Sequence, residues 1–222
     1  GYQNYIKTGK FNFLVIAADK DSHNNPKLHV SPDKHSGKDN PLRGKWKQPN
    51  AMLVLDSSKD AGDIGMIAKA TKAEYKFYGF KGLLWQAFLS GDGADNYNCL
   101  THLKQGLDFG DQSAYKVLKP CKTAKGALQS TIDTFAELLP YGVQYTTHDG
   151  VEKDVPTLEY MNTYFLVAYM LRSDKDTMDF YKLCKAFKVD TSKISSNNKL
   201  SPPKKCLVEE SKIAVVTDDL RT

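Results

Sequence analysis

Short, nearly unbroken apolar runs alternate along the chain with stretches in which apolar residues recur every three or four positions. Three of the runs are rich in strand-forming residues: FNFLVIA at 11–17, MLVL at 52–55 and IAVV at 213–216. Such runs are typical of strands buried on both faces, as in a small sheet covered by helices. We therefore predict an α+β (or α/β) fold whose mixed sheet is built from residues 11–17, 51–56 and 212–217.

The middle of the chain is predicted to be helical. Ser57 and Asp60 have the spacing of a capping box, which predicts a helix over about 57–78. Gly79 and Gly82 are expected to end that helix. The same periodicity predicts further helices over residues 83–89, 99–109, 123–139, 157–171 and 174–187.

One β-hairpin and two polar loops complete the expected organisation. Residues 143–147 and 151–155 have strand character, and Asp149-Gly150 between them is a turn signal. Long polar loops are predicted near 31–50 and 190–205. Because the last predicted strand would rejoin the first ones, we expect a single domain over residues 1–222.

The four cysteines form two pairs with equal spacing. Cys99 and Cys121 are 22 positions apart, as are Cys184 and Cys206. No close Cys-x-x-Cys pair occurs, so a structural zinc site is poorly supported. Two local disulfides are the simplest interpretation, and they predict an oxidising compartment, periplasmic or secreted. The alternative is four buried thiols in a cytosolic protein, because a chain of 222 residues can form a core without bridges.

The charge pattern limits the classes of partner. The net charge is +5, but only three of the cationic residues are Arg, namely Arg43, Arg172 and Arg221. Arg is the residue that binds phosphates and guanine edges in bidentate fashion, so sequence-specific nucleic-acid recognition is disfavoured. No apolar stretch approaches the roughly 20 residues of a membrane-spanning helix, and we predict no such span.

Acidic residues follow the predicted strands and are the candidate ligand or metal site. They are Asp19, Asp21, Asp56, Asp218 and Asp219. Ligands bind at the carboxyl ends of strands in open α/β sheets, and carboxylates are suited to Mg²⁺ or Ca²⁺. Asp is also common in turns and helix caps, which need no ligand. Neither Asp19–His23 nor Asp92–Asp95 matches an EF-hand, and no metal is predicted.

Catalytic signatures are absent from the sequence. It has no Gly-x-Ser-x-Gly, no phosphate-binding lysine loop, no Gly-x-Gly-x-x-Gly and no His-Glu-x-x-His. His102 follows Cys99 by three positions, but a Cys/His nucleophile would also need a third, orienting group. Glu137 and Glu159 are available for glycosidase chemistry, and nothing singles them out. We predict no catalytic residue and no cofactor.

Together these features favour a non-catalytic exported protein that acts through protein–protein contacts. A soluble periplasmic component of a bacterial envelope or secretion assembly would fit. The alternative is a secreted hydrolase that acts on cell wall or glycan with the strand-end carboxylates. A small-ligand or metal-binding module at the same strand ends is a third hypothesis.

Overall fold

A continuous, largely apolar helix forms the centre of the molecule in the computed structural model. It consists of α3 (Gly79–Leu84) followed directly by the π-helical turn η2 (Trp85–Leu89), and all of its residues except Trp85 are buried. Most of its side chains are apolar, Lys81 and Gln86 being the buried polar ones, and a helix that buries apolar residues on all sides has to be enclosed by other elements. The structure describes residues 7, 8, 10, 14–16, 28–30, 56–59, 61–62, 64–67, 73–100, 107 and 109–195.

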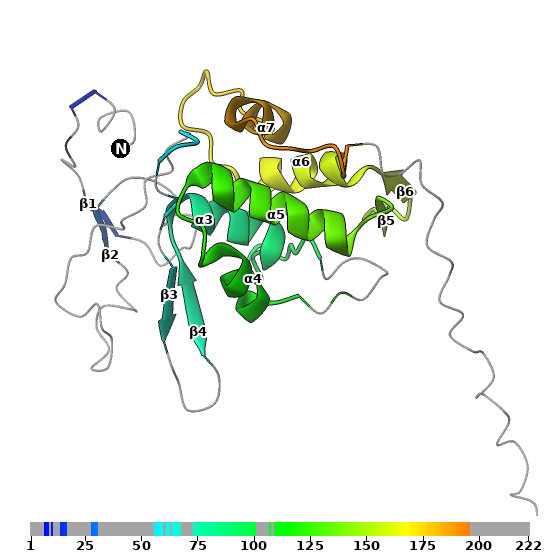
Figure 1. Ribbon diagram of the computed structural model, residues 1–222, viewed down its shortest axis with the longest axis horizontal. Coiled ribbons are helices and arrows are strands. Elements are labelled where there is room, and N and C mark those ends of the chain that lie inside the picture. The colour runs from blue at the N-terminus through cyan, green and yellow to red at the C-terminus, as the bar shows by residue number, and fades with distance from the viewer. Residues whose placement is uncertain are drawn as a thin grey trace, which may run out of the picture.

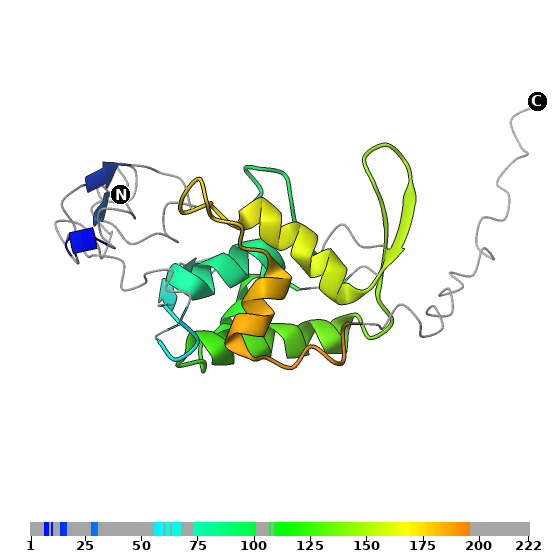
Figure 2. The same ribbon diagram turned by 90° about the horizontal axis from the view of Figure 1, so that it is seen from above.

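Four helices enclose this central helix: α4 (Asp111–Leu118), α5 (Ala124–Leu138), α6 (Thr157–Ala168) and α7 (Phe180–Phe187). α5 packs along α3, α6 packs on η2, α4 packs on α5, and α7 packs on α6 (Figures 1 and 2). Phe88 of η2 lies at the middle of the core. Its ring centroid is 5.9 Å from that of Phe135 in α5 and 5.0 Å from that of Phe180 in α7.

The predicted helices over 123–139 and 157–171 are confirmed with small changes at their ends. Thr123 caps α5, its hydroxyl accepting from the Gly126 amide at 3.1 Å. Asp179 caps α7 by accepting from the Lys182 amide at 2.7 Å, so α7 begins later than predicted. α4 was not predicted, because only Ala114 and Leu118 of its eight residues are buried and leave little apolar pattern.

The helix predicted over 57–78 is wrong. The region holds an antiparallel pair, β3 (Ile64–Ile67) and β4 (Glu74–Phe77), in which Ile64 lies opposite Phe77. Gly79 does not end a helix but begins α3, with a φ of 63° that glycine adopts without a steric penalty. Gly82 lies within α3, where burial of the whole helix offsets the low helix propensity of glycine.

The predicted hairpin is confirmed as β5 (Val143–Thr146) and β6 (Glu152–Val155), which pair antiparallel with Val143 opposite Val155. Gly150 in the turn has a φ of 83°, as the Asp-Gly signal requires. Three consecutive charged side chains, Glu152, Lys153 and Asp154, are exposed along β6.

The α+β fold class is confirmed, but the predicted sheet is not described as a whole. Within the predicted strand 11–17, residues Leu14–Ile16 form β1, which pairs in parallel with β2 (Leu28–Val30). The other two predicted strands lie outside the described residues, apart from Asp56. The loop predicted near 31–50 also lies outside them, as do residues 196–205. In the described part of the chain, none of the helices is both long and apolar enough to cross a membrane.

Candidate functional site

Asp56 is the one strand-end carboxylate among the described residues, and it stabilises a turn. Its Oδ1 accepts from the Ser58 amide at 2.9 Å and from the Ser58 hydroxyl at 2.7 Å. These hydrogen bonds lower the pKa of the Asp56 carboxyl. This is the turn role that was the alternative to a ligand site.

The other four carboxylates of the predicted ligand site lie outside the described residues: Asp19, Asp21, Asp218 and Asp219. Within the described residues, no three His, Cys, Asp or Glu side chains come together in a way that would hold a metal ion.

The described cysteines are free thiols: Cys99, Cys121 and Cys184. The Cys99–Cys121 bridge predicted from spacing is therefore not formed in this structure. Cys99 is fully buried, whereas the half-buried Cys121 has its Sγ 3.4 Å from both the Val117 carbonyl oxygen and the Ser130 hydroxyl, either of which can accept its one S–H. The two thiols thus have separate surroundings. Cys206, the predicted partner of Cys184, lies outside the described residues.

The buried thiols are unsuited to nucleophilic chemistry. Burial raises the pKa of the Cys99 thiol well above its ordinary value and that of Cys184 to about 12. Both thiols therefore remain protonated near neutral pH. Because only the thiolate is an effective nucleophile, they are unreactive there. A Cys/His nucleophile at Cys99 is therefore disfavoured, and His102 lies outside the described residues.

A row of tyrosines packs against the Cys99 region. The rings of Tyr145 and Tyr160 lie 5.3 Å apart, those of Tyr160 and Tyr164 4.9 Å apart, and those of Tyr97 and Tyr164 6.4 Å apart. The Tyr160 hydroxyl donates to the Cys99 carbonyl at 2.7 Å. Burial raises the pKa of Tyr160 and Tyr164, which keeps both phenols neutral. Through these ring contacts, β5, α6 and the segment after η2 pack against one another.

The glycine-rich segment after η2 folds back on itself. Asp92 and Tyr97 exchange backbone hydrogen bonds of 2.9 and 3.1 Å. Gly91, just before them, has a φ of 71°, and a Cβ there would lie 2.3 Å from the Tyr97 carbonyl oxygen. The buried Asp92 carboxylate accepts from the Ala94 amide at 2.9 Å, so this acidic residue has a structural role.

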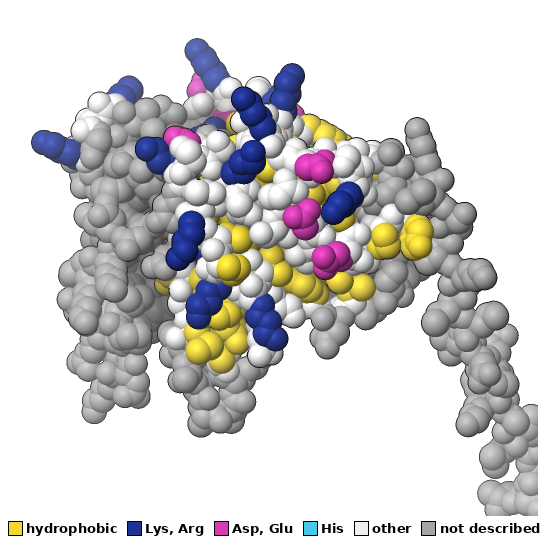
Figure 3. Space-filling view, in the orientation of Figure 1, with side chains coloured by type: hydrophobic (Ala, Val, Ile, Leu, Met, Phe, Trp, Pro, Cys, Tyr) yellow, Lys and Arg dark blue, Asp and Glu magenta, His cyan; other side chains and the backbone are white. Residues whose placement is uncertain are grey.

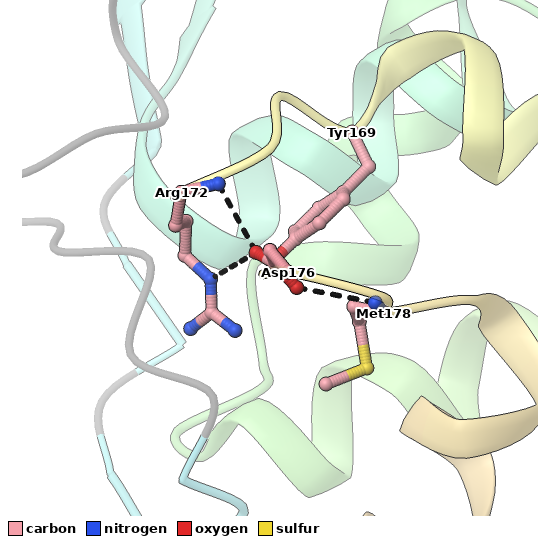
Figure 4. Close-up of polar contacts among 4 residues, drawn as sticks. All are labelled: Tyr169, Arg172, Asp176 and Met178. Carbon is pink, nitrogen blue, oxygen red and sulfur yellow. Dashed lines mark hydrogen bonds and ion pairs between the residues drawn. The ribbon is translucent and has the colours of Figure 1, made fainter. Parts of the chain in front are cut away.

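An Asp176-centred cluster fixes the connection between α6 and α7 (Figure 4). One carboxylate oxygen accepts from the Tyr169 hydroxyl at 2.8 Å, the Arg172 amide at 3.0 Å and the Arg172 Nε at 2.9 Å. The other accepts from the Met178 amide at 3.1 Å. Burial raises the pKa of Asp176, but these hydrogen bonds outweigh burial and lower it to about 2. We call these four residues the Asp176 clamp.

The Asp176 clamp holds two apolar residues toward solvent. Tyr169 is buried and its ring stacks on Phe165 at 4.9 Å, so the chain is fixed just before Met170. Arg172 is fixed just after Leu171 by its bonds to Asp176. The exposed fractions of Met170 and Leu171 are nonetheless 47% and 67%. Their exposure belongs to an ordered part of the structure.

Two more exposed apolar residues lie shortly before them in the chain, on α6. Leu166 and Val167 are 53% and 59% exposed on the side of α6 opposite the core. We define the outer surface of α6 as Leu166, Val167, Met170 and Leu171. The four large apolar side chains lie close together along the chain, whereas single exposed apolar residues are ordinary in soluble proteins. An apolar cluster of this kind is typical of an interaction surface.

The charges beside the outer surface balance. Residues 172–182 contain three cationic and three acidic side chains: Arg172, Lys175, Lys182, Asp174, Asp176 and Asp179. Their sum is zero, so the net +5 of the chain does not arise here. On the face shown in Figure 3, Lys and Arg side chains are likewise spread out with Asp and Glu among them.

Comparison of the chain with family models, with curated proteins and with solved structures found no match. The candidate site therefore rests on the geometry described above.

The sequence pattern predicted a helix over 157–171, with Leu171 as its last residue. That placement is wrong, because α6 ends at Ala168 and Leu171 is exposed. The sequence did contain a sign that this helix has apolar residues outside its buried face. Leu166 and Val167 do not fit the buried face of the helix, so the pattern had apolar residues on two sides.

Proposed function

We propose that this protein acts without catalysis, through protein–protein contacts made by the outer surface of α6. The observation that carries the proposal is the exposure of four apolar side chains, two of them presented by the Asp176 clamp. A contact surface that is ordered before binding loses less conformational entropy on association. The clamp thus supports a role in recognition.

The balanced charge beside the surface favours a protein partner over a membrane or a nucleic acid. Peripheral membrane binding combines apolar residues with an excess of Lys or Arg that attracts anionic lipids. Nucleic-acid binding also depends on excess cationic charge. The flanking segment 172–182 has equal numbers of both signs. Protein interfaces, by contrast, combine an apolar centre with a mixed polar rim.

The size of the surface sets the expected affinity. Complete burial of a Leu, Val or Met side chain contributes about 1.5–3 kcal/mol, so covering the exposed halves of four contributes roughly 3–6 kcal/mol. Association costs about 4–15 kcal/mol in lost freedom of motion. The partner therefore has to supply apolar side chains of its own, and we expect an apolar face about one helix long.

Position-specific cross-linking tests this function. A photoreactive residue replaces Val167 on the outer surface or, as a control, the exposed Gln112 on α4. The cross-linked protein is identified and purified, and its Kd is measured for the wild type and for Leu166→Glu. We expect cross-linking from position 167 alone and a Kd at least about tenfold higher for the variant, because a charge would be buried. Equal Kd values, or equal cross-linking from both positions, would refute the proposal.

The exported location remains part of the proposal, although the free thiols at Cys99, Cys121 and Cys184 reduce the support from cysteine spacing. Its test is a thiol count on protein isolated from its natural source, denatured and alkylated with and without prior reduction. A Cys184–Cys206 bridge would make two thiols reactive only after reduction. Four reactive thiols without reduction would contradict an oxidising compartment.

No observation on the described residues favours the alternative, a secreted hydrolase. Asp56 is engaged in a turn, and the other strand-end carboxylates are not described.

A further inference from the structure

We propose that the protein also binds the surface of an anionic lipid bilayer, through lysines on α4 and the start of α5 and the apolar residues beside them. This surface belongs to other elements than the outer surface of α6. The inference therefore goes beyond the proposed function and does not depend on it.

Lysines occur without acidic residues from the second residue of α4 to the middle of α5. Residues 112–132 contain four lysines and no Asp or Glu, and all four are exposed: Lys116, Lys119, Lys122 and Lys125. Successive members are three residues apart, and three residues of chain span at most about 11 Å, so the four side chains form one continuous group. Both signs of charge occur on the face shown in Figure 3, but the first acidic residue of α5 is Asp133.

A fifth lysine joins this group from the turn that precedes β3. Lys59 is exposed, and its carbonyl accepts from the Ala124 amide at 2.9 Å. The neighbouring Ser57 carbonyl accepts from the Lys125 amide at 3.0 Å. These two bonds hold Lys59 beside the first turn of α5. We define the lysine surface as Lys59, Lys116, Lys119, Lys122 and Lys125.

Acidic residues offset only part of this charge. In the described segments 56–59 and 111–132, five lysines stand against two acids, Asp56 and Asp111, which leaves an excess of three positive charges. Asp111 lies in the first turn of α4, where its carboxylate accepts from Trp85 Nε1 at 3.0 Å and from the Ser90 hydroxyl. The excess contrasts with the zero sum beside the outer surface of α6.

Apolar side chains adjoin the lysine surface. Met66 of β3 is 54% exposed and lies directly opposite Tyr75 of β4, so the two side chains share one face of the strand pair. The Tyr75 ring lies 5.0 Å from that of Tyr115 in α4, and Lys119 Nζ lies 4.8 Å from the centroid of the Tyr115 ring. Figure 3 shows apolar side chains over β4 and α4 with Lys side chains beside them.

This combination favours a bilayer over other anionic partners. Peripheral membrane binding joins excess Lys or Arg to apolar residues, and tyrosines are enriched at the membrane interface. Single-stranded nucleic acids stack on exposed aromatic rings, whereas the Tyr115 ring is covered by Tyr75 and Lys119. Protein interfaces have a rim of mixed charge, whereas residues 112–132 carry only positive charge.

Binding to vesicles tests the inference. The full chain is mixed with vesicles of phosphatidylcholine alone or with about 30% phosphatidylserine, and the bound fraction is measured by flotation. We expect binding to the anionic vesicles only, and its loss when the salt concentration rises from about 0.1 to about 0.5 M. Equal binding to both kinds of vesicle, or binding to neither, would overturn the inference.

The lysines are tested by a pair of double variants with the same change in net charge. Lys116→Gln/Lys122→Gln should weaken binding to anionic vesicles about 25-fold, because each lysine near such a surface contributes about fivefold. Lys175→Gln/Lys185→Gln removes two exposed lysines elsewhere and should weaken it by less than about threefold. Circular dichroism verifies that the variants are folded. Equal losses in the two double variants would contradict a localised lysine surface.

The apolar contribution has its own matched pair. Met66→Gln should weaken vesicle binding by about four- to tenfold, because half of a Met side chain no longer gains by leaving water. Met170→Gln, on the outer surface of α6, should leave vesicle binding unchanged although Met170 is 47% exposed. An effect of Met170 equal to that of Met66 would show that the wrong surface has been assigned.

Two further probes test the class of partner. Single-stranded DNA of about 20 nucleotides that binds more tightly than anionic vesicles, through the same lysines, would replace the bilayer by a nucleic acid. Polyglutamate that binds as tightly as the vesicles and is unaffected by Met66→Gln would replace it by an acidic protein. Leu166→Glu should leave vesicle binding unchanged, so failure of this inference and failure of the proposed function are distinguishable.

Discussion

The central helix and α6 are both rich in apolar residues, yet they lie in different environments. Every residue of α3–η2 except Trp85 is buried, because other helices enclose it. α6 buries Met161, Phe165 and Ala168 on one side and leaves Leu166 and Val167 exposed on the other. Apolar content alone does not place a helix at the centre of a fold. The exposed apolar side of α6 is the side that we propose a partner protein covers.

The largest effect should come from truncation at the centre. Phe88→Ala removes a ring that contacts Phe135 and Phe180, and we expect it to lower the free energy of unfolding by about 3–5 kcal/mol. Denaturation by urea measures this change. Leu171→Ala is the control and should cost no more than about 0.5 kcal/mol, since Leu171 is mostly exposed. Equal losses of unfolding free energy in the two variants would show that Phe88 does not contribute more to the core than Leu171.

The end of the central helix should be nearly as sensitive. Gly91→Ala places a Cβ 2.3 Å from the Tyr97 carbonyl at a φ of 71°, so the loop after η2 has to shift. We expect a loss of about 1–3 kcal/mol in thermal or urea unfolding. Gly93→Ala in the same loop meets no atom within 4 Å and should cost much less. Similar losses for both would mean that this close approach does not constrain the loop.

At the end of α6, removal of charge from the Asp176 clamp should have an intermediate effect. Asp176→Asn weakens an acceptor of four hydrogen bonds, two of them from Arg172, and should cost about 1–3 kcal/mol. Asp190→Asn is a suitable control, because that carboxylate is exposed. Hydrogen exchange should also rise at Met170 and Leu171 in the Asp176 variant. Unchanged exchange there would contradict the role of the clamp in presenting these residues.

The same clamp predicts a smaller, pH-dependent effect. The pKa of Asp176 is lowered from 3.8 to about 2 in the folded protein, so the ionised form stabilises the fold. That contribution is complete at about pH 5, well above the unfolded pKa of 3.8, and is lost as the pH falls toward 2. The difference in unfolding free energy between wild type and Asp176→Asn should therefore shrink between about pH 5 and pH 2. A difference that is constant over this range would show that the pKa is not lowered.

The smallest effect on stability should come from a charge on the outer surface. Leu166→Glu should change the unfolding free energy of the monomer by no more than about 0.5 kcal/mol, although we expect it to weaken association. Measurements at low protein concentration separate the two effects, and Leu166→Ala controls for loss of side-chain volume. A loss above about 2 kcal/mol would show instead that another part of the same chain covers this surface.

Sequence patterns predicted the α+β class, α5, α6, the α7 region and the β5–β6 hairpin, because each has a strong local signal. Thr123 caps α5, and Asp149-Gly150 forms the hairpin turn. The helix over 57–78 failed because a capping-box spacing was given more weight than the alternating pattern of Tyr75 and Phe77 in β4. Local spacing could not show that Asp56 and Ser58 close a turn.

The candidate site was harder to predict, because exposure depends on what packs around a helix. The pattern of α6 contained Leu166 and Val167 outside its buried face, but only the fold shows that no described helix covers them. α6 ends at Ala168, just before the Asp176 clamp, whose members are up to nine positions apart and follow no familiar motif. Equal cysteine spacing also carries no information about the directions of the thiols.

The charged row on β6 has a consequence for solubility. A two-stranded hairpin offers open backbone edges to which further strands can add, and this is how many β-rich proteins aggregate. Glu152, Lys153 and Asp154 place ionised, hydrated groups along that edge. A strand joining there would strip water from these charges, so this edge resists fibril-like growth even when the protein is crowded.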